Sequence, residues 1–215
     1  MKPYKTVRTA AADTVIIHKS RFIGYASPAA TEEEALAFLQ TVRQKYKDAT
    51  HHCYAYIIGL NAGIMRYSDD GEPGGTAGLP IMEVLKAQGV VNVCVVVVTR
   101  YFGGILLGAG GLVRAYTQGC AIALKAAEVV TMEPSVRYLC EVAYPQWDRV
   151  RHALKNLPAQ LLSSEFTTAV TFTLLMRQTD ADAVLVELTR ITDGQMESLL
   201  EEELFYPWAV ESSEA

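Results

Sequence analysis

The alternation of apolar and polar residues predicts strands and a helix at the start of the chain. Two apolar stretches between residues 7 and 26 are typical of a strand pair, with a turn around residues 11–13. A helix is expected next, because Thr31 can cap it and three glutamates occupy its first turn. One face of this helix follows a helical spacing through Leu36, Leu39, Val42 and Tyr46.

The middle of the chain adds further elements by the same reasoning. Strands are predicted at residues 52–58 and 64–67, and a helix is predicted at 79–88. Residues 93–99 read Val-Cys-Val-Val-Val-Val-Thr, which is typical of a strand buried on both faces. A long helix is expected at residues 108–127.

The pattern breaks at residues 130–135, which we interpret as a linker. Beyond it we expect a strand, a helix, two strands, a helix and a strand, at residues 136–143, 145–156, 159–166, 168–176, 180–192 and 196–206. This βαββαβ order is that of the ferredoxin-like fold. The sequence thus predicts an α+β protein with domains at residues 1–130 and 135–210.

Composition narrows the class of protein. Half of the 215 residues are apolar, which suits one large or two small domains and excludes a disordered chain. No apolar run approaches the ~20 residues of a membrane span, and the N-terminal segment lacks a signal peptide's apolar region. We therefore expect a cytoplasmic protein without membrane contact.

Cys94 and Cys120 lie in apolar patterns and are expected to be reduced core residues.

Charge is divided unevenly between the two halves. Residues 1–127 carry 13 Lys/Arg and 9 Asp/Glu, a formal charge of +4, whereas residues 128–215 carry 6 and 15, a charge of −9. Such asymmetry indicates two units with different partners, of which only the first suits a polyanion. The alternative is two domains whose solvated surfaces simply differ.

Glycines and carboxylates gather in the middle of the chain. Ten of the fifteen glycines fall between residues 71 and 111, which indicates unusual backbone angles or backbone lying against a ligand. Asp69, Asp70 and Glu72 repel one another unless a cation, hydrogen-bond donors or solvent relieves their charge. They suggest a Mg²⁺ site. The alternative is a solvated turn whose aspartates cap backbone amides.

Two adjacent histidines, His51 and His52, open a predicted strand. Because neighbouring strand residues point to opposite faces, His52 shares a face with Tyr54, and His51 shares one with Cys53. We expect one histidine to be structural and the other functional, although the sequence does not say which. With carboxylates nearby, the functional histidine would serve as a metal ligand or general base.

Small residues open the long helix at Gly108, Gly110 and Gly111. Exposed N–H groups and the helix dipole favour a phosphate or carboxylate there, and Arg100 and Arg114 would add guanidinium groups. The alternative is that these arginines pair with the acidic loop. The residues match neither a P-loop nor a dinucleotide fingerprint, and the sequence contains no Gly-x-Ser-x-Gly nucleophile elbow.

Motifs across about residues 15–127 resemble those of the Impact family, whose bacterial members carry a small second domain. The matching segments are KSRFI (19–23), ATHHCYA (49–55), SDDGEP (68–73), GTAG (75–78), TRYFGG (99–104) and LGAGGLVRAY (107–116). The resemblance implies a first domain with the domain-2-like βαβ fold of a ribosomal small-subunit protein, and a second like one of elongation factor G. Eukaryotic family members are translation regulators, which implies ribosome or nucleic-acid contact.

We therefore expect a non-enzymatic regulator of translation or RNA metabolism that binds RNA or the ribosome through its glycine-rich anion site. Aromatic residues would stack on bases, and arginines would bind phosphates. The residues expected at this interface are Lys19, Arg21, His51, His52, Arg100, Tyr101, Phe102, Gly103, Gly104, Gly108, Gly110, Gly111 and Arg114. The acidic second domain would contact protein instead.

The alternative function is a metal-assisted hydrolase or phosphotransferase. In that case Asp69, Asp70 and Glu72 would hold a divalent ion such as Mg²⁺, and His51 or His52 would carry protons. No cofactor is expected otherwise. A third hypothesis is a protein-interaction module that needs no nucleic acid.

Overall fold

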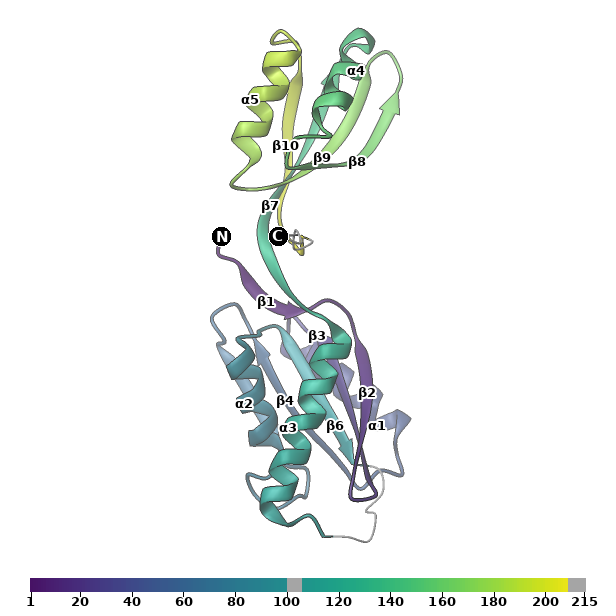
Figure 1. Cartoon of the computed structure of the whole chain (residues 1–215), viewed down its shortest axis with the longest axis vertical. Helices are drawn as coiled ribbons and strands as arrows, with labels where there is room; N and C mark the ends of the chain where they lie inside the picture. Colours follow the sequence, from purple (N-terminus) through teal and green to yellow (C-terminus); the bar gives the residue numbers. More distant parts are fainter. Residues whose placement is uncertain (100–105, 209–215) are drawn as a thin grey trace, which may run out of the picture. The chain divides into compact units, whose positions relative to one another are not determined.

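The computed structural model describes residues 1–99 and 106–208 and divides the chain into two compact units (Figure 1). The first unit comprises residues 4–131, and the second comprises residues 1–3 together with those from 132 onward. Each unit has its own hydrophobic core. Among the described residues, no helix is long and apolar enough to cross a membrane.

The first unit is built on a five-stranded sheet in which all neighbouring strands are antiparallel. Its strands, in spatial order, are β2 (Ala11–Ile17), β3 (Ser20–Pro28), β6 (Val93–Thr99), β4 (His51–Ile58) and β5 (Ile64–Ser68). The strands predicted at 52–58, 64–67 and 93–99 are confirmed to within one residue. A short strand, β1 (Tyr4–Val7), pairs with β7 (Val129–Val142), which begins in this unit.

Helices cover both faces of this sheet. α2 (Gly78–Gln88) and α3 (Gly108–Ala127) lie on one face, and α1 (Glu32–Lys45) lies on the other (Figure 1). Along β6, the odd-numbered valines pack under α2 and α3, whereas Cys94 and the even-numbered valines pack under α1. The prediction of a strand buried on both faces is confirmed.

The first helix begins as predicted, and Leu39 and Val42 are buried, but one residue of the predicted face is not. Glu34 N donates a hydrogen bond to the Thr31 hydroxyl at 3.2 Å, as an N-cap requires. Leu36, which was expected in the core, is 43% exposed, and Ala35 is fully buried instead. The prediction was wrong because the small Ala35 lets the helix lie close to β6, where Cys94 Sγ contacts Ala35 O at 3.6 Å.

The first strand pair turns later than predicted. Ala11 pairs with Ala26, and Ile17 pairs with Ser20, so residues 11–13 lie inside β2. The turn is formed by His18 and Lys19, whose φ angles are 45° and 67°. Positive φ at both positions is typical of a two-residue type I′ turn, which usually contains Asn or Gly. The sequence carries no such residue here, which is why the turn was misplaced.

Two glycines allow α3 to lie unusually close to the sheet. A Cβ atom at Gly24 of β3 would overlap the carbonyl oxygen of Gly119, and one at Gly119 would lie 2.8 Å from Val97 Cγ1. Glycine in a strand interior often marks such a close approach. This contact sets the position of α3 on the sheet, and hence the position of its first turn.

All four cysteines are unpaired and buried. Burial raises the pKa of the Cys94 thiol to about 12, so this group stays protonated at neutral pH. The prediction that Cys94 and Cys120 are reduced core residues is confirmed.

The second unit has the predicted βαββαβ order. After β7 come α4 (Tyr144–Ala153), β8 (Ala159–Phe166), β9 (Val170–Arg177), α5 (Ala181–Ile191) and β10 (Glu197–Tyr206). The strand order β10-β7-β9-β8 places the first and third strands of the unit at the centre, as in ferredoxin-like folds. Trp147, Phe172, Leu174 and Leu188 contribute to its core. The α+β class predicted from the sequence is confirmed.

The two units divide between residues 131 and 132, inside the segment predicted as the linker, but residues 130–135 are part of the continuous strand β7. Val129, Val130 and Thr131 are β-branched and favour a strand. Pro134 is tolerated because the ladder with β9 begins one residue later, at Ser135, and the Pro134 carbonyl accepts a hydrogen bond from Gln178 N. The proline and the neighbouring Glu133 suggested a break that does not occur.

Candidate functional site

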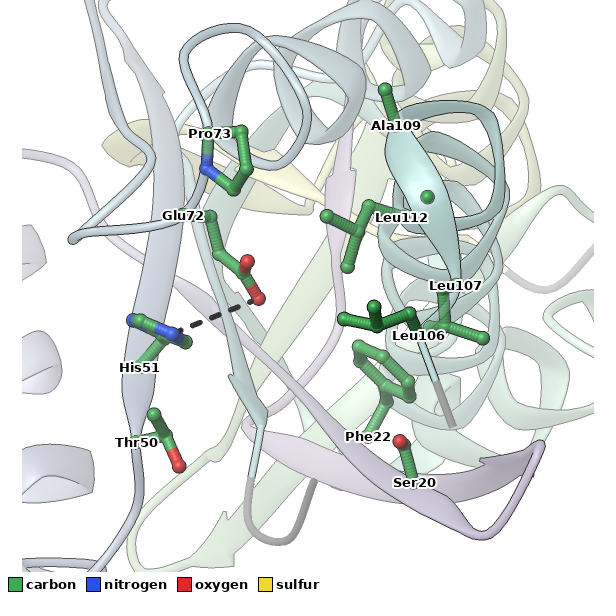
Figure 2. Close-up of a pocket in the computed structure, with 11 residues that line it drawn as sticks. Ser20, Phe22, Thr50, His51, Glu72, Pro73, Leu106, Leu107, Ala109 and Leu112 are labelled. Atoms are coloured by element: carbon green, nitrogen blue, oxygen red, sulfur yellow. Dashed lines mark ion pairs between the residues drawn. The ribbon is translucent and has the colours of Figure 1, made fainter. Parts of the chain in front are cut away.

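A pocket of about 440 Å³ opens in the first unit beside the first turn of α3, and we call it the α3 pocket (Figure 2). Its apolar wall consists of Phe22, Pro73, Leu106, Leu107 and Leu112. The remaining described lining residues are Ser20, Thr50, His51, Glu72, Gly108 and Ala109. A mainly apolar cavity with a few convergent polar groups is the usual form of a ligand site.

His51 reaches the α3 pocket from the start of β4. Its Nδ1 lies 2.8 Å from the carbonyl oxygen of Asp70. Because a carbonyl can only accept, Nδ1 carries the hydrogen, and in the neutral ring Nε2 is left as an acceptor. Nε2 lies 4.0 Å from Glu72 Oε1, on the same side of the pocket (Figure 2).

Glu72 supplies a carboxylate that is nearly buried, with a side-chain exposure of 10%. The hydroxyl of Tyr116, a fully buried residue of α3, donates to Glu72 Oε1 at 2.7 Å. The Tyr116 ring also packs edge-on against Phe22, with centroids 5.4 Å apart. These contacts hold the Glu72 carboxylate between His51 and the leucines of the apolar wall (Figure 2).

Asp69 caps the start of α2. Its carboxylate accepts hydrogen bonds from Gly75 N, Ala77 N and Gly78 N at 2.8–3.0 Å. Burial of the group raises its pKa, but the three amide donors outweigh that effect, so the pKa of Asp69 is lowered overall. The amides of this helix N-terminus are therefore occupied by the chain's own oxygens.

Asp70 joins β4 to α1. One carboxylate oxygen accepts from His52 N at 2.7 Å, and the other lies 3.3 Å from the Arg43 guanidinium. The three neighbouring carboxylates thus have three different sets of partners. In the described part of the chain no group of three or more His, Cys, Asp or Glu side chains could hold a metal ion. Metal binding stays a prediction, and no contact among these groups favours it.

His52 lies on the opposite face of the sheet from the α3 pocket, as the alternation of strand residues predicted. Its side chain is buried, and Nε2 donates to the carbonyl oxygen of Tyr46 at 3.0 Å. Burial lowers the pKa of His52, although the nearby Asp70 carboxylate acts in the other direction. These contacts are those of a structural histidine, whereas His51 reaches the pocket.

The lowered pKa of His52 predicts a loss of stability in mild acid. The unfolded chain takes up this proton near pH 6.5, whereas the folded chain resists it, so protonation favours unfolding. As the pH falls from about 7, the free energy of unfolding should decrease by at most about 1.4 kcal/mol per pH unit from this group. Urea denaturation of the wild type and His52→Gln at a series of pH values measures the difference. Parallel profiles would contradict the prediction.

The glycine-rich start of α3 remains accessible. A Cβ atom at Gly108 or Gly110 would meet nothing within 4 Å, whereas one at Gly111 would lie 3.0 Å from Leu107 Cβ. Arg114, one turn further on, is exposed. The alternative that Arg114 pairs with the acidic loop is wrong, since within residues 1–99 and 106–208 it forms no ion pair, and Arg43 contacts Asp70 instead.

The other expected basic residues that the structure describes do not line the α3 pocket. Lys19 is exposed in the β2–β3 turn, and Arg21 alternates with Phe22 and so faces the α1 side of the sheet. The remaining expected residues, which are Arg100, Tyr101, Phe102, Gly103 and Gly104, lie outside the described residues.

Several residues of the site were given no role from the sequence. Leu112 and Tyr116 follow Gly108 at intervals of four, so the three share one face of α3. That spacing was the available signal, but it is equally typical of an ordinary core face. The Arg43 contact with Asp70 carried no sequence signal, because the two residues lie 27 positions apart.

Comparison with known proteins agrees with this division of the chain. The Impact N-terminal domain family matches residues 18–124, and a domain of unknown function, DUF1949, matches residues 140–195. A crystal structure of a hypothetical protein is 31% identical, with a TM-score of 0.59, and the match covers 94% of this chain and 98% of that one.

Relatives in other organisms match over most of the length. The chain is 37% identical to "IMPACT family member YvyE" of Bacillus subtilis, over 94% of this chain and 93% of that protein. It is 35% identical to "IMPACT family member YigZ" of Escherichia coli, over 87% of this chain and 92% of that protein. "Protein IMPACT homolog" of Saccharomyces cerevisiae is 32% identical over 46% of this chain and 39% of its own length.

Proposed function

The chain belongs to the Impact family, and on that premise we propose that it is a non-enzymatic regulator of translation whose first unit binds RNA. In this proposal the α3 pocket accepts a base, and the first turn of α3 binds the adjoining phosphate. Arg114 adds a second contact to the phosphate backbone.

One observation carries the proposal: a mainly apolar pocket opens directly beside an accessible helix N-terminus that is followed by an exposed arginine. An unstacked base needs apolar or aromatic walls, and its phosphate needs N–H donors and positive charge. The pocket contains Phe22 and three leucines, while Gly108 and Gly110 leave space around the backbone of the first turn. The two chemical requirements of a nucleotide are thus met side by side.

The charge distribution supports the same assignment. The half of the chain that contains the α3 pocket has a formal charge of +4, and the other half has −9. A polyanion is repelled by the acidic half, so RNA would bind to the first unit and the second unit would contact protein.

The test is binding of fluorescently labelled single-stranded RNA, followed by anisotropy over a range of salt concentrations. Affinity should fall steeply with salt, because phosphate contacts release counterions. Arg114→Ala should weaken binding about three- to tenfold and reduce the salt slope by about 1, uniformly across sequences.

Lys125→Ala is the matched control, because Lys125 is an exposed cation in the last turn of the same helix. It lies eleven residues, or about 16 Å, from Arg114, so its replacement should leave the affinity nearly unchanged. Binding that does not respond to salt, or equal effects of the two variants, would overturn the proposal.

A further inference from the structure

The α3 pocket presents two hydrogen-bond acceptors side by side. With Nδ1 donating to the Asp70 carbonyl, Nε2 is the ring nitrogen of His51 that is left for the pocket, where the neutral imidazole accepts; it lies 4.0 Å from Glu72 Oε1. Glu72 Oε2 makes no hydrogen bond with any residue within 1–99 and 106–208. Glu72 and His51 thus present acceptors to the pocket, whose other polar side chains are the hydroxyls of Ser20 and Thr50.

The opposite side of the pocket suits a flat ring. Leu106, Leu107 and Leu112 face His51 and Glu72 across the cavity, with Phe22 beside them (Figure 2). Its volume of about 440 Å³ is within the usual range of small-molecule sites. A planar heterocycle can thus contact the leucines while its polar edge meets the two acceptors.

The partner that fits two such acceptors is an amino group with two diverging N–H bonds. Glu72 Oε1 accepts from Tyr116 and has a second lone pair, and it lies 4.0 Å from His51 Nε2, so one nitrogen about 2.9 Å from each can donate to both. Carboxylates recognise the amino group of cytosine in the same way at other nucleic-acid interfaces.

Resting on the proposed RNA binding, we propose that the α3 pocket selects an unstacked base with an exocyclic amino group, and thus cytosine over uracil. The cytosine amino group donates to Glu72 and to His51 Nε2. Uracil carries a carbonyl oxygen at the same position, so it places a third acceptor against the two and adds no donor to the one that the nearly buried carboxylate receives from Tyr116.

The test compares labelled oligo(C) and oligo(U) of equal length on the full chain, with anisotropy as the readout. The two ligands have the same charge and similar ring size, so the base edge accounts for the difference. We expect oligo(C) to bind about tenfold more tightly than oligo(U). Glu72→Gln should reduce this ratio to about two or less, because the glutamine amide offers uracil a donor.

Glu83→Gln is the matched control, since Glu83 is an exposed glutamate of α2 paired with Lys86, outside the α3 pocket. It removes the same charge and should leave the oligo(C) preference unchanged. Equal binding of oligo(C) and oligo(U) by the wild type overturns base selection but leaves RNA binding intact. Binding of neither ligand overturns the proposed function itself. The comparison of oligo(C) with oligo(U) on the wild type tests base selection even if Glu72→Gln does not fold.

Discussion

Replacement of Gly24 by alanine is expected to destabilise the first unit by at least about 3 kcal/mol. The new Cβ atom would overlap the carbonyl oxygen of Gly119 and lie 3.0 Å from Ala123 Cβ. The first obstacle is backbone rather than the end of a flexible side chain, so α3 itself would have to move away from the sheet. Urea denaturation followed by far-UV circular dichroism measures the loss.

The matched control is Gly74→Ala. A Cβ atom at Gly74 would meet nothing within 4 Å, so this variant should remain within about 0.5 kcal/mol of the wild type. Both tryptophans, Trp147 and Trp208, belong to the second unit, so their fluorescence reports separately on that unit. Equal stability of the two alanine variants would show that α3 does not depend on the Gly24 contact.

Replacement of Asp69 by alanine is expected to lower the free energy of unfolding by about 3 kcal/mol at neutral pH, or about 1 kcal/mol for each lost hydrogen bond. The variant removes the acceptor of three backbone amides, Gly75 N, Ala77 N and Gly78 N. Ala77 and Gly78 are buried, so water does not readily replace the lost oxygen. Asp13→Ala is the control, because the exposed Asp13 carboxylate accepts only from the neighbouring Thr14 N. The midpoints of urea unfolding measure both effects.

The lowered pKa of Asp69 also predicts how the free energy of unfolding changes with pH. Because the folded pKa of Asp69 is lowered, its contribution to stability is present above the unfolded pKa of about 3.9 and disappears as the pH falls through the folded value. The difference in unfolding free energy between the wild type and Asp69→Asn should therefore be largest near pH 7 and shrink below about pH 4. A difference that stays constant down to about pH 3 would contradict this account.

Most of the fold could be predicted because its signals are local. The run of β-branched residues at 93–99 indicates a strand buried on both faces, and α3 has the bounds that its apolar spacing predicts. Errors arose where a local signal was missing or misleading. His18 and Lys19 form a turn without glycine or asparagine, and Pro134 is accommodated inside a strand.

The site was predicted only in part, because its contacts join distant segments. The sequence indicated that His51 and His52 face opposite sides of the sheet, but not that His51 faces the α3 pocket. The hydroxyl that binds Glu72 belongs to Tyr116, 44 positions away. Such a contact depends on how closely α3 lies on β3, which the pair of glycines at 24 and 119 permits.

The sequence by itself determined most of the strands and helices, their βαββαβ order in the second unit, and the opposite orientation of neighbouring strand residues. These follow from periodicity and backbone preference, which act over a few residues. Only the tertiary structure decided the separate roles of three nearly adjacent carboxylates. Asp69 caps a helix, Asp70 binds Arg43 and the backbone of β4, and Glu72 reaches a pocket. The direction in which each carboxylate side chain points depends on the path of the loop and on partners far along the chain. No local sequence pattern encodes either of these.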